Sequence, residues 1–566
     1  MSLISRLKSL CPSSDTPVVL ELDLSRAVLS SPPDNPLAAL QVINAPSMRA
    51  IREGLRRAAT DDHVKGLIVH IGTAQFSAAQ GDELAALIRR FGEAKPTVAW
   101  TESFGEFASA VFAYKLAAAA SQVWVQESGV LAIGGLHLDI TLLKGLLNKA
   151  GIEPQFGQRK EFKSAADRFA ADHVSEANRE MMTRIGQSLV EDAVASIAAD
   201  RDLAVEAVWE AVNAGQLTSD EAVTRGFIDS VGYRDEVYAA ALAEWDAEPE
   251  NLVFVHRYAE IDRFAALVPN PKKPAFAVVD VRGSIVTGRG QQGPLSGRQA
   301  ASDVVTEHLR AAARDEQVKG VLLRVDSPGG SYIASDAIRR EVLQVKASGR
   351  PVVAVMGDVA ASGGYFVSMP ATEIVAAPST LTGSIGVLAG KMVTAGLYEK
   401  LGLVREGIDI GARAGMLAPG RLFTEDDWAM LNAELDRIYA DFTAKAASDR
   451  GMPLESLEPL ARGRVWTGTD AAERGLVDHL GGVDLALDRL ADLTGVPRDE
   501  ARIKPIGTLG LLERFRPARS SETLSSAGVG MGMPASPDEW LTAAASVLGI
   551  SVPGVLSLPV VPEVRG

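Results

Sequence analysis

Apolar and polar positions along the chain follow two recurring patterns. Helical spacing of apolar residues, as in IREGLRRAATDDHVKG, runs directly into short stretches rich in Val, Ile and Leu, such as VKGLIVHIG at 64–72. Near-continuous apolar strands separated by helices are typical of a mainly parallel sheet whose two faces are covered by helices. The pattern therefore predicts an α/β protein.

The pattern occurs twice. VKGLIVHIG at 64–72 returns as VKGVLLRVD at 318–326, and KPTVAW at 95–100 returns as RPVVAVMG at 350–357. Later segments correspond as well, since GLLNKAGIEPQFG matches GLYEKLGLVREGIDIG, and LTSDEAVTRGFIDSVG matches WTGTDAAERGLVDHLGG. Internal similarity of this kind indicates a tandem repeat of one supersecondary unit. We therefore expect two α/β units built on one plan.

The predicted domain boundaries follow from the repeat and from breaks in composition. VPNPKKPA at 268–275 interrupts the pattern with prolines and lysines just before the strand-like FAVVDVRGSI. We predict an N-terminal extension at 1–50, a first repeat at 51–270, a second repeat at 271–505 and a flexible C-terminal tail at 506–566. The tail ends in the apolar, proline-broken VLGISVPGVLSLPVVP, which we interpret as a docking segment rather than a membrane span.

Composition narrows the classes of function. The chain has 566 residues, which is longer than a domain with a single hydrophobic core normally is, so at least two domains are expected. Its formal net charge of −15 gives no basic surface that could bind nucleic acid. The single cysteine, Cys11, can form neither an intramolecular disulfide nor a Cys-rich metal site. No apolar run has the length of a signal peptide or a membrane span. We expect a soluble cytoplasmic protein that does not bind nucleic acid.

The N-terminus leaves one alternative open. Residues 2–10 carry Arg6 and Lys8 on a short amphipathic stretch. A plain N-terminal tail is the favoured interpretation, and peripheral contact with the cytoplasmic membrane is the alternative.

The two repeats differ at two glycine-rich turns. DSPGGS at 326–331 ends a predicted strand of the second repeat, where the first repeat has GTAQFS at 72–77. DVAASGGYFVS places Ser362 between a strand and a helix, directly before Gly363, where the first repeat has Val111. A serine beside N–H groups on bare glycine backbone suits acyl transfer, because such donors can hold the oxyanion of a tetrahedral intermediate. The bland interpretation, tight turns and a helix-capping serine, does not explain why both turns are absent from the first repeat.

A nucleophilic serine needs a base. None of the seven histidines lies in the glycine-rich turns, and a histidine distant in sequence stays open as an alternative. A lysine with its ordinary pKa of about 10.4 is almost wholly protonated at neutral pH, so burial must lower that pKa before the amine can act. Lys163, in EFKSAADRF, lies among apolar and small residues and is the candidate, with a solvated surface lysine as the alternative.

Four motifs in this tandem setting carry a family resemblance. DSPGGS, AASGGY, STLTGSIG and FKSA resemble the signal peptide peptidase A family of the long, two-repeat type, also called protease IV. The resemblance covers roughly residues 50–500. It implies the spiral ββα fold shared with Clp protease and the crotonases in each repeat, and a split dyad with Lys163 as general base and Ser362 as nucleophile.

The resemblance also implies supporting roles for other motif residues. Ser384, in TGSIG, would orient the lysine amine, and the carbonyl of Gly157 would do the same. The N–H groups of Gly363 and of Gly329 or Gly330 would form the oxyanion hole.

The resulting functional prediction is a serine endopeptidase. It would cleave apolar peptides, such as signal peptide remnants, and unfolded polypeptides through an acyl-enzyme on Ser362, with no metal and no other cofactor. The resemblance implies a homotetramer whose interior restricts access. Two alternatives stay open. One is a crotonase-like acyl-CoA enzyme, which needs a carboxylate near the turns, where Asp326 is the one acid. The other is an inactive scaffold.

Overall fold

The structure, a computed structural model, divides the chain into two compact units. It describes residues 16–30, 45–73, 76–106, 108–261, 273–290, 298–507 and 556–557. Unit 1 contains the described residues up to His137 and those from Gly186 to 261, and unit 2 contains Leu138–Ile185 and those from 273 onward.

Several predictions from the sequence fall outside the described residues. These are the membrane contact of residues 2–10 and nearly all of the tail at 506–566, of which the structure describes residues 506–507 and Leu556–Ser557. Among the helices that the structure describes, none is both long enough and apolar enough to cross a lipid bilayer.

Unit 1 is built on a six-stranded sheet with the order β8-β4-β3-β2-β1-β9, in which every neighbouring pair is parallel. The strands of this sheet are β1 (Val18–Asp23), β2 (Val64–His70), β3 (Thr97–Thr101), β4 (Gln122–Val125), β8 (Ser230–Val231) and β9 (Leu252–Phe254). Unit 1 also has a separate pair of strands, β5 (Val130–Ala132) and β7 (Gln216–Thr218). Its helices are α3 (Met48–Ala58), α4 (Ala78–Gly92), α5 (Val111–Ala118), α9 (Val205–Ala214), α10 (Ser219–Thr224), α11 (Arg234–Glu244) and α12 (Val255–Ile261). The boundary at Ile185 divides α8 (Glu176–Arg201).

Unit 2 has an eight-stranded sheet with the path β19-β17-β15-β13-β10-β21, to which β16 and β20 add beside β15. Its strands are β6 (Glu153–Arg159), β10 (Ala275–Arg282), β11 (Ser284–Val286), β12 (Gln299–Ala301), β13 (Val318–Ser327), β14 (Gly329–Gly330), β15 (Val352–Ala361), β16 (Glu373–Ala376), β17 (Leu381–Gly383), β18 (Val387–Val393), β19 (Val465–Thr467), β20 (His479–Leu480), β21 (Arg502–Pro505) and β22 (Leu556–Ser557). Its helices are α6 (Lys144–Ala150), α7 (Asp167–Ala170), α13 (Ser302–Arg314), α14 (Tyr332–Ala347), α15 (Gly363–Ser368), α16 (Ala395–Lys400), α17 (Glu425–Asp449), α18 (Leu454–Leu457), α19 (Gly468–Glu473) and α20 (Val483–Thr494).

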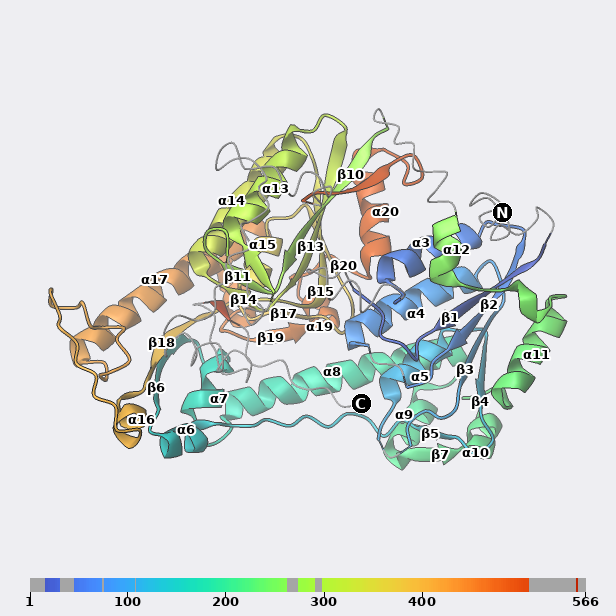
Figure 1. The fold of residues 1–566 in the computed structure, drawn as a ribbon, viewed down its shortest axis with the longest axis horizontal. Coiled ribbons are helices and arrows are strands. Elements are labelled where there is room, and N and C mark those ends of the chain that lie inside the picture. Colours follow the sequence, from blue (N-terminus) through green and yellow to red (C-terminus); the bar gives the residue numbers. More distant parts are fainter. Residues whose placement is uncertain are drawn as a thin grey trace. The chain divides into compact units, whose positions relative to one another are not determined.

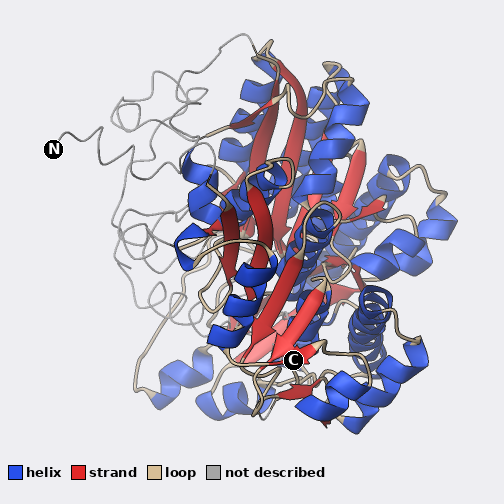
Figure 2. Cartoon of the chain, turned by 90° about the vertical axis from the view of Figure 1, so that its right-hand side faces the viewer, coloured by secondary structure: helices blue, strands red, loops and turns tan. Residues whose placement is uncertain are grey.

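Each main sheet is buried on both faces, with helices covering its strands (Figure 2). Along β1, Leu20 packs into one apolar cluster and its neighbour Val19 into the cluster on the opposite face. Along β10, Ala277 and Phe276 are divided in the same way. Burial on both faces explains the near-continuous apolar runs in the sequence, because successive side chains of a strand point to opposite faces.

The two main sheets repeat one plan. The strands β9-β1-β2-β3-β4-β8 of unit 1 correspond in order to β21-β10-β13-β15-β16-β20 of unit 2. A buried hydrogen bond is also repeated, since Tyr114 Oη donates to the Phe227 carbonyl (2.5 Å) and Tyr365 Oη donates to the Leu476 carbonyl (3.1 Å). The predicted α/β class and the predicted tandem repeat are confirmed.

One segment of the first repeat is part of unit 2. Residues 138–185 carry β6, which pairs antiparallel with β18 from Val387↔Arg159 to Val393↔Glu153 (Figure 1). The predicted division at 270/271 therefore describes the repeats along the sequence, whereas the compact units are divided differently. This pairing determines where the residues that follow β6 lie.

The repeated tyrosine contact gives a matched pair of stability tests. Tyr365→Phe removes a buried donor and leaves the Leu476 carbonyl without its hydroxyl partner, so we expect a loss of about 1–3 kcal/mol in the free energy of unfolding. Tyr114→Phe should cost a similar amount through Phe227. Urea unfolding followed by circular dichroism measures both, and an unchanged midpoint for either variant would contradict the role assigned to that hydroxyl.

Candidate active site

Ser362 lies on a sharp turn between β15 and α15. Its backbone has φ 56° and ψ −112°, a conformation that non-glycine residues rarely adopt. The turn is held because the Ser362 N–H donates to the Gly383 carbonyl (2.8 Å) and the Ser362 carbonyl accepts from the Phe366 N–H (2.8 Å). The strand-to-helix position predicted from the sequence is therefore present, with its hydroxyl fully buried.

The glycines after Ser362 are required by close packing. A Cβ at Gly364 would lie 2.4 Å from the Ser327 carbonyl oxygen, and a Cβ at Gly363 would lie 2.8 Å from Ser335 Oγ. Real Cβ atoms do not approach backbone this closely, so the turn accepts only glycine at Gly364.

Lys163 follows β6 and is completely buried. Its Nζ lies 2.8 Å from Ser362 Oγ, 2.9 Å from Ser384 Oγ and 2.9 Å from the Ser384 carbonyl oxygen. The residue is 199 positions from Ser362 in the sequence, and the β6–β18 ladder brings the two together. Three of the residues singled out from the sequence therefore meet at one point.

Burial lowers the pKa of the Lys163 amine well below its ordinary value. The cause is desolvation, and none of the charged groups that the structure describes raises this pKa in opposition. The amine is therefore poised to be neutral at a pH where an exposed lysine is protonated, which is the state that a general base needs.

A neighbouring loop holds the lysine in place. Phe162 donates its N–H to the Arg462 carbonyl (3.2 Å), and Ser384 donates its N–H to the Arg464 carbonyl (2.6 Å). Between them, Gly463 has φ +84° and packs so closely that a Cβ there would lie 2.5 Å from Lys163 Cβ. The sequence analysis missed this loop, and its signal was the glycine of ARGRVW just before the segment that repeats.

Gly157, the other residue predicted to orient the lysine amine, has different surroundings. Gly157 lies in β6 opposite Ala389 and faces α17, and it is not among the hydrogen-bond acceptors described for the Lys163 amine. The third acceptor is instead the carbonyl of Ser384.

The glycines of DSPGGS lie beside the serine turn. A Cβ at Gly363 would be 3.0 Å from Gly329 Cα and 3.1 Å from Gly330 N, so β14 runs directly alongside. Gly329 donates its N–H to Ser327 Oγ at 3.2 Å. The structure thus places β14 beside Gly363, and of the two predicted glycine donors the N–H of Gly329 is already donated to Ser327 Oγ.

The corresponding place in the first repeat has no such chemistry. Val111, fully buried at the start of α5, stands where Ser362 stands in the second repeat. The buried lysine of this region, Lys115, contacts the carboxylates of Asp82 and Asp192. Burial by itself would lower the pKa of Lys115, but the two carboxylates raise it overall, so this amine stays charged.

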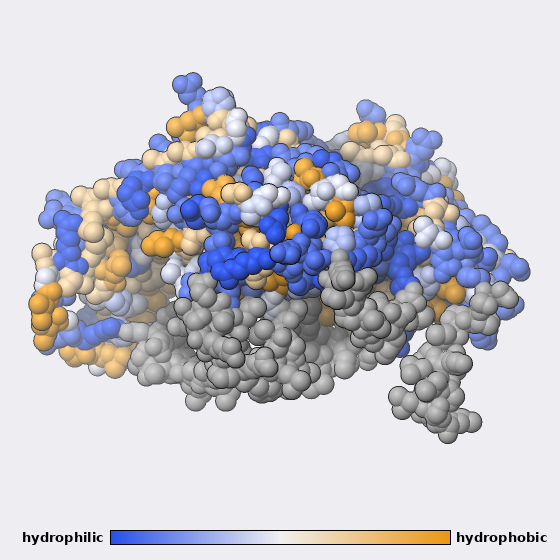
Figure 3. Space-filling view, turned by 90° about the horizontal axis from the view of Figure 1, so that it is seen from above, coloured by the Kyte–Doolittle hydropathy of each residue, from blue (hydrophilic) through white to orange (hydrophobic). Residues whose placement is uncertain are grey.

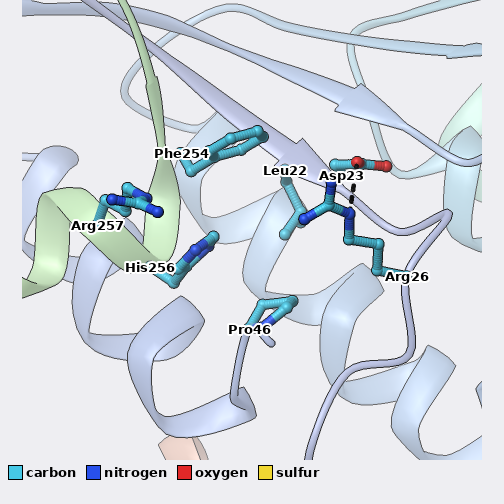
Figure 4. A pocket seen from close by; sticks show the side chains of 7 residues that line it. All are labelled: Leu22, Asp23, Arg26, Pro46, Phe254, His256 and Arg257. Carbon is cyan, nitrogen blue, oxygen red and sulfur yellow. Dashed lines mark ion pairs between the residues drawn. The ribbon is translucent and has the colours of Figure 1, made fainter. Parts of the chain in front are cut away.

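Unit 1 has a pocket of its own, shown in Figure 4. The residues lining it are Leu22, Asp23, Arg26, Pro46, Phe254, His256 and Arg257. Arg26 and Asp23 form an ion pair at 4.0 Å, and the lining has no hydroxyl or thiol nucleophile. Among the described residues no group of three or more His, Cys, Asp or Glu side chains could hold a metal ion.

Comparisons with a family model and with known proteins point to the same kind of protein. Peptidase family S49 matches residues 89–248 and 344–497. The chain is 30% identical over 491 residues to "Serine protease SPPA, chloroplastic" from Arabidopsis thaliana, covering 86% of this chain and 70% of that protein. It is 34% identical over 206 residues to "Putative signal peptide peptidase SppA" from Enterococcus faecium, and this match covers 36% of this chain and 60% of that protein.

A solved structure is also similar to part of the chain. A ClpP1 mutant from Listeria monocytogenes matches 37% of this chain and 94% of its own, at 15% identity and a TM-score of 0.24.

The lowered pKa of Lys163 predicts how stability changes with pH. The unfolded chain keeps the ordinary lysine pKa, so between the two pKa values it binds more protons than the folded chain, and the free energy of unfolding rises with pH. Lys163→Met lacks this group. We expect it to be more stable than the wild type at pH 7, with the difference shrinking as pH approaches about 10, measured by urea unfolding.

Lys115→Met is the matched control for this experiment. Removing this buried lysine takes away the ammonium group that the part-buried carboxylates of Asp82 and Asp192 both contact, so we expect a loss of about 3–5 kcal/mol over the same pH range. A Lys163→Met chain that is less stable than the wild type at pH 7 would contradict the lowered pKa.

Proposed function

Because the chain belongs to peptidase family S49 and is a serine-type peptidase, we propose that Ser362 is its nucleophile and Lys163 its general base. The observation that carries this assignment is the contact of 2.8 Å between Ser362 Oγ and an amine with no exposed surface. A neutral amine has two N–H donors and one lone pair. The carbonyl and hydroxyl oxygens of Ser384 supply acceptors for both donors, which leaves the lone pair for the Ser362 hydroxyl.

The proposed reaction proceeds through an acyl-enzyme. The Lys163 amine takes the proton of Ser362 as Oγ attacks the peptide carbonyl, and the resulting ammonium gives that proton to the leaving amine. Water then attacks the ester and loses a proton to Lys163, and the ammonium returns that proton to Ser362 Oγ as the acid product leaves. The oxyanion of each tetrahedral intermediate would be held by the N–H of Gly363 together with that of Gly330, because the N–H of Gly329, the other candidate, already donates to Ser327 Oγ.

Ser384 acts in this proposal as a positioning residue. It touches the amine of Lys163, and its own backbone is held at φ 50° by the hydrogen bond to Arg464. Gly157 would support the amine only indirectly, through the β6–β18 ladder.

The alternatives are not favoured. An acyl-CoA enzyme would need a free carboxylate at the turns, and Asp326 already accepts the Val359 N–H at 3.4 Å. The family match points to a peptidase, and an inactive scaffold does not account for a completely buried lysine in contact with a serine.

The proposed substrates are apolar peptides, including cleaved signal peptides, and unfolded polypeptides. The printed name of the Enterococcus faecium relative supports the signal peptide class. Cleavage of a peptide in the middle of its sequence would distinguish this endopeptidase from an enzyme that trims ends.

The kinetic test compares three substitutions in the hydrolysis of a fluorogenic apolar peptide and of a denatured protein. Ser362→Ala should leave only background, Lys163→Met should lower kcat by about 10²–10⁴-fold, and Ser384→Ala should lower it roughly 3–10-fold. The wild-type rate should rise with pH as the amine of Lys163 loses its proton. Lys149→Met, an exposed lysine of α6, is the control and should keep full activity. Near-full activity of Lys163→Met would refute the assigned base.

We also propose that the protein is a homo-oligomer, for which the family resemblance implies a tetramer. The segment after α16 corresponds in the repeat to the segment after α6 that forms β6, yet it is not paired as a strand in the described structure. It exposes Val404, Ile408 and Ile410, each more than 90% exposed. Figure 3 shows hydrophobic residues gathered at its left edge, where this segment lies in Figure 1. A second copy of the chain is the proposed cover.

A charge on this segment tests the assembly. Ile408→Asp should reduce the mass measured by light scattering toward that of one chain, because burying a carboxylate in an apolar contact is costly. Val205→Asp, at an exposed apolar position of unit 1, is the control and should leave the mass unchanged. An Ile408→Asp chain with the wild-type mass would show that the segment is not the interface.

A further inference from the structure

One loop of unit 2, residues 461–464, is hydrogen-bonded to two parts of the candidate site. The Arg462 carbonyl accepts the N–H of Phe162, the residue directly before the proposed base, at 3.2 Å. The Arg464 carbonyl accepts the N–H of Ser384 at 2.6 Å, and the hydroxyl of that serine contacts the lysine amine. The loop therefore joins the segment that carries the lysine to the residue that orients it.

The backbone of this loop depends on contacts with its surroundings. Arg462 has φ +54° and Gly463 has φ +84°, so two successive residues have positive φ. Glycine adopts such a conformation at little cost, whereas a residue with a side chain is strained there unless its neighbours hold it. The conformation of Arg462 therefore requires a partner outside the loop.

Tyr439 of α17 is such a partner. Its hydroxyl accepts the Arg462 N–H at 3.2 Å and donates to Glu458 Oε1 at 3.2 Å, at the start of the 3₁₀ turn η4 (Glu458–Leu460) that leads into the loop. The tyrosine side chain is buried. Burial and the Glu458 carboxylate raise the pKa of this hydroxyl to about 12, so at neutral pH it keeps the proton that it donates.

The same helix packs against the strands that position the lysine. α17 contacts both β6 and β18. A Cβ on Gly157 of β6 would lie 2.9 Å from Leu435 Cδ1, one helical turn before Tyr439. One helix therefore supports the β6–β18 ladder and, through the tyrosine hydroxyl, the loop at 461–464.

Ion pairs also link the loop to its neighbours, but they are exposed. Arg462 pairs with Glu161 at 2.7 Å and with Glu458 at 3.3 Å, and each of these side chains is at least 33% exposed. A further cation, Lys160, lies 5.7 Å from the centre of the Tyr439 ring. Exposed ion pairs contribute little because water screens them. The buried hydroxyl is therefore the contact that fixes the backbone of Arg462.

We propose that Tyr439 is a positioning residue for the peptidase reaction, and that through the loop at 461–464 it keeps the Lys163 amine out of water and against Ser362. The tyrosine acts on the two reactive groups through the backbone of the loop. The proposal rests on the function proposed above, because the position of this amine affects turnover only if the amine is the base.

Loss of the hydroxyl has a defined consequence. The Arg462 N–H loses its acceptor, so the loop can relax from its positive-φ conformation and release the N–H groups of Phe162 and Ser384. Water then reaches the amine, and a hydrated amine keeps its proton to a higher pH. A residue that only stabilised the fold would not change the pH at which the base becomes neutral.

The test is the pH dependence of kcat/KM for a fluorogenic apolar peptide, measured on full-length chains. Tyr439→Phe should move the midpoint of the rise in rate upward by about one pH unit, which is a roughly tenfold loss below that midpoint, and the two rates should converge at high pH. Glu458→Gln keeps an oxygen that accepts from the hydroxyl but loses the ion pair with Arg462, and it should keep the wild-type midpoint. Tyr114→Phe removes a buried hydroxyl in unit 1 and should keep it as well. An unchanged midpoint in Tyr439→Phe, or an equal loss at every pH, would overturn the role assigned to the tyrosine.

Hydrogen exchange separates this inference from the assignment of the dyad, because it needs no turnover. In a Ser362→Ala chain, adding Tyr439→Phe should speed exchange of the Phe162 and Ser384 amides about tenfold, since both donate to carbonyls of the loop. Equal exchange in the two chains would show that the hydroxyl does not hold the loop, whatever the activity. Faster exchange together with full activity of Ser362→Ala would leave Tyr439 as the anchor of the loop and refute the proposed nucleophile.

Discussion

The site depends on the antiparallel pairing of β6 with β18. A lysine acts as a base near neutral pH only when it is taken out of water, and removing an amine from water opposes folding by several kcal/mol. Among the residues that the structure describes, no carboxylate pairs with Lys163 to compensate this loss, and its hydrogen bonds involve Ser362 and Ser384. The ladder of backbone pairs between β6 and β18, together with the close contact at Gly463, keeps the amine buried although an amine is more stable in water.

Two buried lysines in this chain illustrate how surroundings determine chemistry. Lys115 and Lys163 are both removed from solvent, yet the carboxylates beside Lys115 raise its pKa, whereas burial alone lowers that of Lys163. The first is a charged structural group in a repeat with Val111 in place of the serine, and the second faces a hydroxyl. Divergence of the two repeats has therefore kept the sheet order and the tyrosine contacts while the reactive groups became specialised.

Much of this was accessible from the sequence, because the signals are local. Apolar runs indicated the strands, the duplicated segments indicated the repeat, and the glycines around Ser362 indicated a turn that excludes side chains. The motif resemblance pointed to Lys163 and Ser384, which lie together. The pairing of β6 with β18 joins residues more than 200 positions apart, and no periodicity reports such a contact. The same holds for Gly463, whose importance comes from a neighbour distant in sequence, and for the two-residue strand β22, which is too short to leave a pattern.

The separation of the two reactive groups along the chain has a consequence for the cell that makes this enzyme. Lys163 precedes Ser362 by 199 residues, so a ribosome adding roughly 5–20 residues per second leaves the nucleophile unmade for about 10–40 s after the lysine. During that interval the nascent polypeptide has no complete dyad, and the turn at Ser362 gains its carbonyl partner at Gly383 only later still. In the proposed assignment, a protease divided in this way stays inert until both reactive residues have been made, because the lysine meets the serine only when β6 pairs with β18.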